Sequence, residues 1–342
     1  MNCSLAIDVM SGDHGPEVTV PAAIDVLQSQ PKMHLTLVGD KERIENYLQN
    51  CSDKIKHRIT IVHSTQVVEM DEKPSLALRG KKDSSMRVAI NLVKEKKVNA
   101  CVSAGNTGAL MATARFVLKM LPGISRPAIC TALPTIKGHT HMLDLGANID
   151  LSSEQLFEFA VMGSVLTQAV DNLENPSVGL LNIGEEEVKG NEQVKNAAKL
   201  IADSNLNYYG FIEGTDIYKG TVNVVVCDGF VGNISLKTSE GVARMISFYL
   251  KQAFNKNILT KFVGLLSMPI LNSFKQKVDP GEYNGASLLG LRGIVIKSHG
   301  SANRRSFAQA IREAALEVDK NVPELISKQV EVFLGNQQNS QD

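Results

Sequence analysis

Six apolar runs in this chain end abruptly in glycine mixed with Asp, Asn, Ser or His, and this pattern constrains the fold strongly. The six stretches are Ile7–Gly15, Val102–Gly108, Leu143–Asn148, Leu181–Gly190, Val224–Asn233 and Ile296–Ser301. A continuous Val/Ile/Leu run is typical of a buried parallel strand, and ligands of open α/β sheets bind beyond the carboxyl ends of such strands. Glycine there lets backbone amides approach an anion, and a following helix start adds partial positive charge. The six strand ends therefore predict one composite anion site.

Strand and helix patterns alternate along most of the chain, which predicts an α/β fold with a doubly wound, mostly parallel sheet in three layers. No Pro- or Gly-rich linker divides it. We therefore expect one α/β catalytic domain over residues 1–330 and a polar C-terminal tail over residues 331–342, disordered from Gly335. Ser152 followed by Gln155 has the spacing of a capping box and predicts a helix start, and Gly232 precedes a long helical pattern.

Charge and cysteine content exclude several classes of protein. Lys and Arg total 36 and Asp and Glu total 36, whereas nucleic-acid binding normally needs a basic excess. Five cysteines without a C-x-x-C pair favour reduced thiols over a disulfide framework, and Cys227 is interpreted as a buried apolar side chain rather than a nucleophile. The first ten residues lack the pattern of a signal peptide. We expect a cytoplasmic protein that does not bind nucleic acid.

A basic, apolar excursion over residues 250–280 interrupts the α/β pattern. Between Gly241 and Val278 there are six Lys or Arg residues and no Asp or Glu. Apolar residues recur at helical spacing on both sides of Pro269, which predicts two short amphipathic helices. They can contact an anionic membrane surface or an acidic partner, or form an ordinary dimer or core helix pair. The residues expected to make the membrane or partner contact are Lys256, Lys261, Phe262, Leu266 and Lys275.

Long motifs at these strand ends resemble one family, the bacterial phosphate acyltransferases of phospholipid synthesis, from residue 4 to about residue 320. The matching motifs are Asp8–Pro16 (DVMSGDHGP), Ser103–Ala109 (SAGNTGA), Asp144–Asn148 (DLGAN), Asn182–Gly184 (NIG), Lys189–Glu192 (KGNE), Cys227–Asn233 (CDGFVGN), Leu288–Leu291 (LLGL) and His299–Ser301 (HGS). The sequence departs from the family pattern at Ser11 and Asn284, where the family usually has Gly, and at Ser287, where it usually has Pro.

The resemblance implies an isocitrate/isopropylmalate dehydrogenase-like sheet and transfer of a long-chain fatty acyl group from acyl carrier protein to inorganic phosphate. The product is an acyl phosphate for phospholipid synthesis. It also implies a homodimer with the site near the interface. Phosphate is already a competent oxygen nucleophile, so no covalent Ser or Cys intermediate is needed, and the chain has no G-x-S-x-G motif. The enzyme must hold a dianion beside the thioester and donate to the developing oxyanion.

For that reaction we expect Lys189 and Asn233 to be catalytic. Lys189 would neutralise phosphate, although such a lysine is otherwise a solvated surface residue, and Asn233 is alternatively a helix N-cap. The expected substrate-binding residues are Gly12, Asp13, His14, Gly105, Asn106, Thr107, Asn148, Asp228, His299 and Gly300. Gly105–Thr107 is alternatively a plain capped turn, and His14 a structural hydrogen-bonded residue.

No metal and no cofactor are expected, because the seven histidines show no ligand spacing and there is no Walker A or G-x-G-x-x-G loop. Three other readings stay open. A short-chain phosphate acetyltransferase would not need the amphipathic excursion. A dehydrogenase would need a nicotinamide site. A non-catalytic scaffold of lipid synthesis at the membrane would not need six glycine-bearing strand ends.

Overall fold

The computed structural model describes the backbone of residues 3–278 and 280–339, with most of their side chains, and places eleven strands of this part of the chain in one sheet. The strands are β1 (Cys3–Asp8), β2 (Met33–Gly39), β3 (Ile59–His63), β4 (Ala100–Ser103), β5 (Ala128–Thr135), β6 (Gly138–Leu143), β7 (Ser177–Leu181), β8 (Asn207–Ile212), β9 (Val224–Val226), β10 (Ala286–Leu289) and β11 (Ile294–Lys297). Their spatial order is β3-β2-β1-β4-β11-β10-β5-β6-β9-β7-β8.

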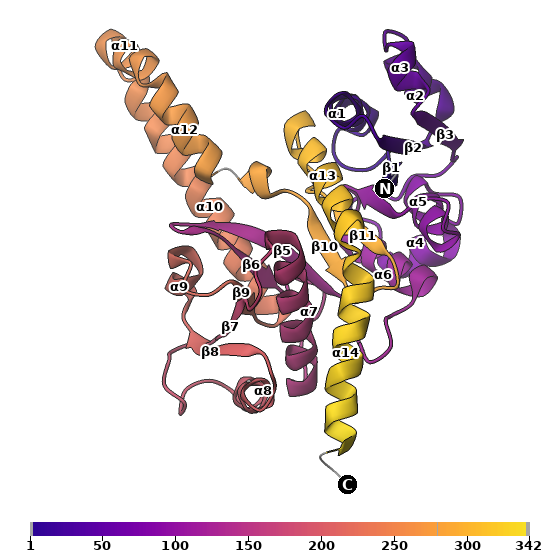
Figure 1. The fold of residues 1–342 in the computed structure, drawn as a ribbon. Coiled ribbons are helices and arrows are strands. Elements are labelled where there is room, and N and C mark those ends of the chain that lie inside the picture. Colours follow the sequence, from indigo (N-terminus) through magenta and orange to yellow (C-terminus); the bar gives the residue numbers. More distant parts are fainter. Residues whose placement is uncertain (1–2, 279, 340–342) are drawn as a thin grey trace.

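Helices follow or connect these strands (Figure 1). They are α1 (Pro16–Ser29), α2 (Lys41–Leu48), α3 (Asp53–Lys56), α4 (Pro74–Gly80), α5 (Ser85–Lys94), α6 (Thr107–Leu118), α7 (Ser153–Asp171), α8 (Glu192–Ala202), α9 (Gly214–Lys219), α10 (Gly229–Phe254), α11 (Ile258–Leu266), α12 (Met268–Val278), α13 (Arg304–Lys320) and α14 (Val322–Asn339), with one 3-10 turn at Pro280–Tyr283. None of those described is both long and apolar enough to cross a membrane.

Helices pack on both faces of the sheet. Leu5 and Ile7 of β1 belong to a buried cluster with α1 and α13, whereas Ala6 belongs to one with α5 and α6, because successive side chains of a strand point to opposite faces. In the other half, α7, α8 and α14 share a cluster on one face and α9 lies in a second cluster. The expected α/β fold with a large, mostly parallel sheet is confirmed.

The direction of the strands changes in the middle of the sheet. Strands β1, β2, β3, β4 and β11 are mutually parallel. Strand β10 pairs antiparallel with β11 and β5, and β5 pairs antiparallel with β6. Strands β6, β9, β7 and β8 are again mutually parallel and therefore run opposite to β1. The carboxyl ends of β1, β4 and β11 lie at one edge, and those of β6, β7 and β9 at the other. The expectation that all six ends meet at one edge is wrong.

Local signals at helix ends were reliable in one case and misleading in two. The Ser152–Gln155 capping box is present. The long helix after β9 begins at Gly229 with Asp228 as its N-cap, so the interpretation of Asn233 as an N-cap is wrong. Helix α14 continues through Asn339, so the disorder expected from Gly335 is wrong up to that residue. Residues 340–342 of the expected polar tail lie outside the described part.

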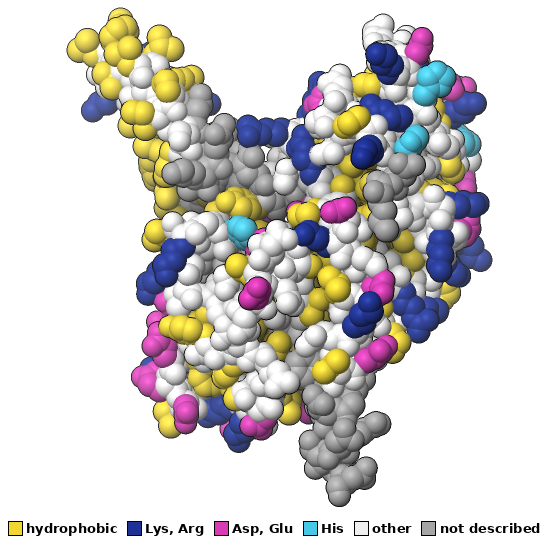
Figure 2. Space-filling model, viewed as in Figure 1, with side chains coloured by type: hydrophobic (Ala, Val, Ile, Leu, Met, Phe, Trp, Pro, Cys, Tyr) yellow, Lys and Arg dark blue, Asp and Glu magenta, His cyan; other side chains and the backbone are white. Residues whose placement is uncertain are grey.

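Helices α10, α11 and α12 form an arm that projects from the sheet (Figure 1). The predicted pair of short helices is confirmed as α11 and α12, and Pro269 lies in the first turn of α12, where proline is tolerated. Many apolar side chains of the arm are exposed, and Figure 2 shows them gathered at its tip. Those on α11 and α12 that are at least half exposed are Ile258, Leu259, Phe262, Val263, Leu265, Leu266, Met268, Ile270 and Phe274. The core-helix alternative for this segment is therefore wrong.

Candidate active site

The ends of β1, β4 and β11 meet through backbone contacts. The amide of Asp13 donates to the carbonyl of Gly300 at 2.9 Å. Gly12 has a φ of 80°, and a Cβ at this position would lie 2.9 Å from the Gly300 oxygen and 3.0 Å from Cβ of Ala104. Only glycine fits this close approach without strain. Three of the expected binding residues, Gly12, Asp13 and Gly300, are thus brought together, and His14 is exposed in the same loop.

A buried hydrogen-bond chain holds these loops in register. Ser103 donates its hydroxyl to Oδ2 of Asp8 at 2.6 Å and accepts from the amide of Gly105 at 3.1 Å. Ser11 donates to the Asp8 carbonyl and accepts from the Ala104 amide. Burial raises the pKa of the Asp8 carboxyl. Ser11, a departure from the family pattern, therefore turns into the protein and links β1 to β4.

Asn106 is also engaged within the protein. Its Oδ1 accepts from the Ala109 amide as the N-cap of α6, and its Nδ2 donates to the carbonyls of Met70 and Glu72. The Gly105 amide is bonded to Ser103, as described above. The capped-turn interpretation therefore accounts for Gly105 and Asn106, while Thr107 is exposed as the first residue of α6. An anion here would meet the first-turn amides of α6.

Lys297, the last residue of β11, is a functional candidate that the sequence analysis missed. Its side chain is buried, and the residue is only 9% exposed. The ammonium group contacts the carbonyls of Ala104, at 3.4 Å, and Ser298. Burial lowers the pKa of Lys297 to about 8, although Asp13 and Asp8 act in the opposite direction. The sequence signal that could have identified Lys297 is a lysine at the end of an apolar run. A buried cation is costly unless it is paired or has a function, so such a lysine is a candidate site residue.

Helix α10 connects this edge of the sheet with the other. Burial and then the positive charge of Lys237, on α10, lower the pKa values of Lys297 and His299. Lys237 follows Asn233 by four residues, so the two share a helix face and are separated by about 6 Å along the axis. Asn233 therefore lies one helical turn from a residue that acts electrostatically on the β11 end.

The ends of β6 and β9 form a second, tightly packed set. Asp144 accepts from the amides of Ile129, Ala147 and Asn148. Asn148 donates Nδ2 to Pro127 at 2.7 Å and to Asp144 at 2.9 Å. Both amide protons of Asn148 are thus used inside the protein, and in this geometry Asn148 stabilises the loop, while its expected contact with the ligand stays a prediction.

Glycines set the start of α10 against this second set. A Cβ on Gly232 would overlap the carbonyl oxygen of Asp144, and one on Gly146 would lie 3.4 Å from Cβ of Asn233. Asp228 caps the helix by accepting from the Val231 amide at 2.9 Å, so its carboxylate is structural here. Asn233 is exposed beside Gly146.

Lys189 lies in the loop after β7, next to β9 in the sheet. Its Nζ is 2.7 Å from Oε2 of Glu186, and its side chain is 43% exposed. This hydrogen bond to Glu186 raises the pKa of Lys189. The structure places Lys189 among the β6, β7 and β9 ends with Asn233, away from the β1, β4 and β11 ends.

Two further sequence predictions concern individual side chains. Burial raises the pKa of the Cys227 thiol well above its usual range, in agreement with an inert buried cysteine. Lys256, Lys261, Phe262 and Leu266 are on or beside α11, and Phe262 and Leu266 are at least 60% exposed. The side chain of Lys275 lies outside the described residues.

The chain is a mixed α/β protein whose fold is shared by solved phosphotransacylases and dehydrogenases. The chain is similar to EutD phosphotransacetylase from Staphylococcus aureus, with a TM-score of 0.60 and 17% identity over 93% of this chain and 94% of that one. It is also similar to 4-hydroxythreonine-4-phosphate dehydrogenase from Klebsiella pneumoniae, with a TM-score of 0.54 and 15% identity over 93% and 98%. At these identities the likeness shows the fold alone.

Sequence comparison defines the family. The chain belongs to the family described as "Fatty acid synthesis protein", whose model matches residues 3–325. A relative named "Phosphate acyltransferase", from Nitrosococcus oceani, is 58% identical over 338 residues, which is 99% of both chains. The family resemblance expected from the motifs is confirmed.

Proposed function

We propose that this enzyme transfers a long-chain fatty acyl group from the thioester of acyl carrier protein to inorganic phosphate and forms an acyl phosphate for phospholipid synthesis. The observation that carries the proposal is the 58% sequence identity, over 99% of both chains, to the relative named phosphate acyltransferase. The geometry agrees with it, since a buried Lys297 and several glycine-shaped loops face the same sheet edge. We also propose that the sheet is of the isocitrate/isopropylmalate dehydrogenase-like type.

The proposal assigns the following roles to the residues. Lys297 and the first-turn amides of α6 hold the phosphate dianion, with Lys237 adding positive charge from α10. A phosphate oxygen attacks the thioester carbonyl carbon, a C–O bond forms and the C–S bond breaks. The leaving thiolate takes a proton from solvent. Asn233 donates to the carbonyl oxygen while it carries negative charge. The proposed role of Lys189 is to neutralise charge in the transition state, and it requires the two edges of the sheet to approach each other around the substrates.

The direct test is to incubate the purified chain with palmitoyl acyl carrier protein and inorganic phosphate and to trap acyl phosphate as the hydroxamate. Product that depends on both substrates is expected. Turnover with acetyl-CoA but not with the long-chain carrier thioester would favour the phosphate acetyltransferase alternative. The absence of any product from folded protein would favour the scaffold alternative.

We expect Lys189→Met to lower kcat about 100-fold, because a donor to the transition-state charge is lost. Glu186→Gln is the matched control: this exposed ion pair contributes little to stability, and its removal frees Lys189, so kcat should stay close to wild type. Steady-state kinetics with the carrier thioester measures both. A Lys189→Met variant with wild-type kcat would show that Lys189 is only a solvated surface residue.

The exposed arm supports a peripheral contact of this cytoplasmic enzyme with the inner face of an anionic membrane. Its tip is apolar and the adjacent Lys256 and Lys261 are cationic, a combination that binds anionic lipid interfaces. A homodimer is a further part of the proposal, and the arm is also available to a second copy. Light scattering of the purified chain reports the oligomeric state.

Leu266→Glu is expected to reduce co-sedimentation with vesicles of phosphatidylglycerol and phosphatidylethanolamine several-fold, because it puts a carboxylate into the apolar tip. Leu76→Glu changes a leucine of similar exposure on α4 and should leave sedimentation unchanged. Turnover of the soluble carrier substrate should survive in both variants. Equal sedimentation of Leu266→Glu and wild type would assign the tip to a protein contact.

A further inference from the structure

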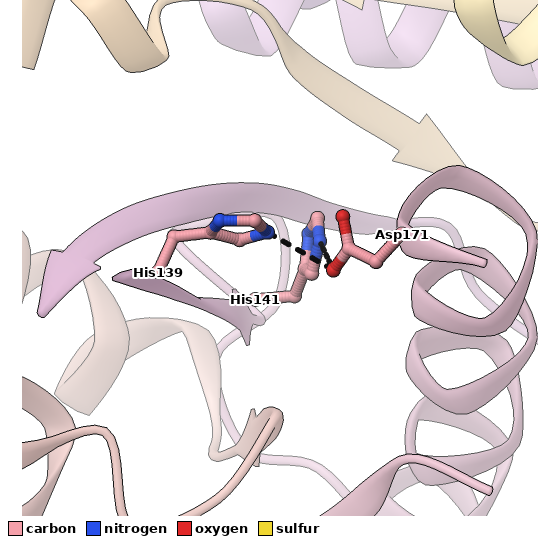
Figure 3. Close-up of side chains that lie close together, drawn as sticks. All are labelled: His139, His141 and Asp171. Atoms are coloured by element: carbon pink, nitrogen blue, oxygen red, sulfur yellow. Dashed lines mark hydrogen bonds and ion pairs between the residues drawn. The ribbon is translucent and has the colours of Figure 1, made fainter. Parts of the chain in front are cut away.

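Two histidines and an aspartate that the acyl-transfer proposal does not use lie close together at the start of β6. His139 and His141 are two residues apart on this strand and therefore share one face. Nε2 of His139 is 2.9 Å, and Nε2 of His141 is 3.0 Å, from the same carboxylate oxygen, Oδ2 of Asp171. Figure 3 shows both rings directed at this carboxylate, at the end of α7. One ligand atom from each residue lies within 4.8 Å of the others.

The cluster forms part of the wall of a cavity of about 660 Å³, including the solvent at its mouth. Helix α13 contributes Glu313 and Glu317 to the wall. Glu317 is 1% exposed, and its Oε1 has no hydrogen-bond partner among the described residues. An unpaired buried carboxylate oxygen is costly. A cation in the cavity, or a water molecule bound to that cation, would give this oxygen a partner.

The charge of the cavity wall agrees with a cation. Three acidic side chains line it, and none of the described lining residues is lysine or arginine. Burial raises the pKa of Glu313, and that of Glu317 to about 8, so a bound cation would favour their ionised forms. Two of the positions at which the sequence departs from the family pattern, Asn284 and Ser287, also line it. The hydroxyl of Ser287 hydrogen-bonds Glu317. Two of the three departures thus line this cavity, and Asn284 also accepts from the amide of His299 at 2.9 Å.

We propose that His139, His141 and Asp171 bind one divalent transition-metal ion of the zinc type. Imidazole nitrogens select such ions over Mg²⁺ and Ca²⁺, which prefer oxygen ligands. Two histidines and one carboxylate form a known zinc ligand set. At zinc bond lengths of about 2.0–2.2 Å, tetrahedral ligand atoms lie about 3.4 Å apart. The two His–Asp pairs therefore need to open by about 0.4–0.5 Å, and the two histidine ligand atoms, within 4.8 Å of each other, need to adjust to the same spacing.

Binding exchanges the ion for protons. Each coordinating Nε2 must give up its proton, to solvent from an imidazolium or to Nδ1 from a neutral imidazole, and the carboxylate exchanges two hydrogen bonds for one metal bond. Glu313 and Glu317 then lie within the same cavity, where they can accept from water on the fourth position of the ion. The ion would join β6 and α7, two elements that belong to the half of the sheet containing Asn233 and Lys189.

The test uses the untagged full-length chain, stripped of metal with a chelator. Titration with Zn²⁺ against a chromophoric competitor should give one ion per chain, and Co²⁺ should give the visible absorption of a tetrahedral site. His141→Gln and Asp171→Asn are each expected to weaken Zn²⁺ binding by more than about 100-fold, since even loss of an outer partner costs 10–100-fold. His57→Gln, at an exposed histidine, is the control and should bind as wild type.

Thermal unfolding of the metal-free variants shows whether they are folded. Zn²⁺ should raise the Tm of wild type and of His57→Gln but not that of His141→Gln. Millimolar Mg²⁺ should not compete. The proposal is overturned if wild type binds Zn²⁺ no more tightly than folded His141→Gln, or if the stoichiometric site survives in both ligand variants. Neither result depends on acyl transfer.

Discussion

Replacing Lys297 with methionine is expected to lower kcat/KM for inorganic phosphate by about 100- to 1,000-fold, the usual cost of removing one charge-stabilising donor. Methionine fills a similar volume in the buried end of β11, so the fold should be retained. The loss follows from position: Lys297 is the buried cation at the edge where Gly12, Asp13 and Gly300 meet. Initial rates at varied phosphate, with the carrier thioester saturating, measure it.

The pH profile gives this prediction a second readout. The pKa of Lys297 is lowered to about 8, so the side chain is cationic below that pH and neutral above it. Phosphate turnover should therefore decline as the pH rises through about 8, and Lys297→Met should lack this alkaline decline. Lys32→Met, at an exposed lysine, is the control for loss of a charge alone. An unchanged rate and an unchanged profile in Lys297→Met would remove Lys297 from the phosphate site.

Gly232→Ala is expected to destabilise the chain by about 3 kcal/mol, at the upper end of the range for overpacking. The added methyl group would overlap the Asp144 carbonyl oxygen and lie 3.0 Å from Sγ of Cys227. Both neighbours are buried, so helix α10 must shift. A Tm decrease of at least about 5 °C should follow, with reduced turnover because Asn233 moves with the helix.

Gly241→Ala tests the same substitution farther along the same helix. Apart from the neighbouring backbone of α10, no atom of the described residues lies within 4 Å of its added Cβ, so alanine should stabilise α10 by about 0.5–1 kcal/mol through its higher helix propensity. Differential scanning calorimetry compares the two variants under one condition. Equal Tm values for Gly232→Ala and wild type would mean that α10 is not held against β6 as the structure shows.

Much of the fold could be predicted because it depends on local pattern. Apolar runs marked the strands of the sheet, and Ser152 with Gln155 marked a helix start, since such signals involve residues close in sequence. The reversal of strand direction at β10 and β5 could not be predicted in this way. It depends on which distant strands pair, and each strand looks the same in either direction.

The candidate site was predictable where glycine marked a close backbone approach, as at Gly12 and Gly300. The site was less predictable for side chains whose role depends on their hydrogen-bond or ionic partners. Asn148 stabilises its loop in the structure, because Asp144 and Pro127 accept hydrogen bonds from its side-chain amide. Lys297 and the His139–His141 pair were missed because burial and the approach of Asp171 across 30 residues are not visible in local sequence.

Helix α10 carries Asn233 near its first turn and the apolar tip of the arm beyond its last. It has 26 residues, about 39 Å of length, and no proline to bend it. The apolar tip and the candidate catalytic residue Asn233 therefore lie at opposite ends of one continuous helix. If the tip docks on a surface as proposed, a rigid α10 would transmit that contact to the orientation of Asn233, the candidate catalytic residue.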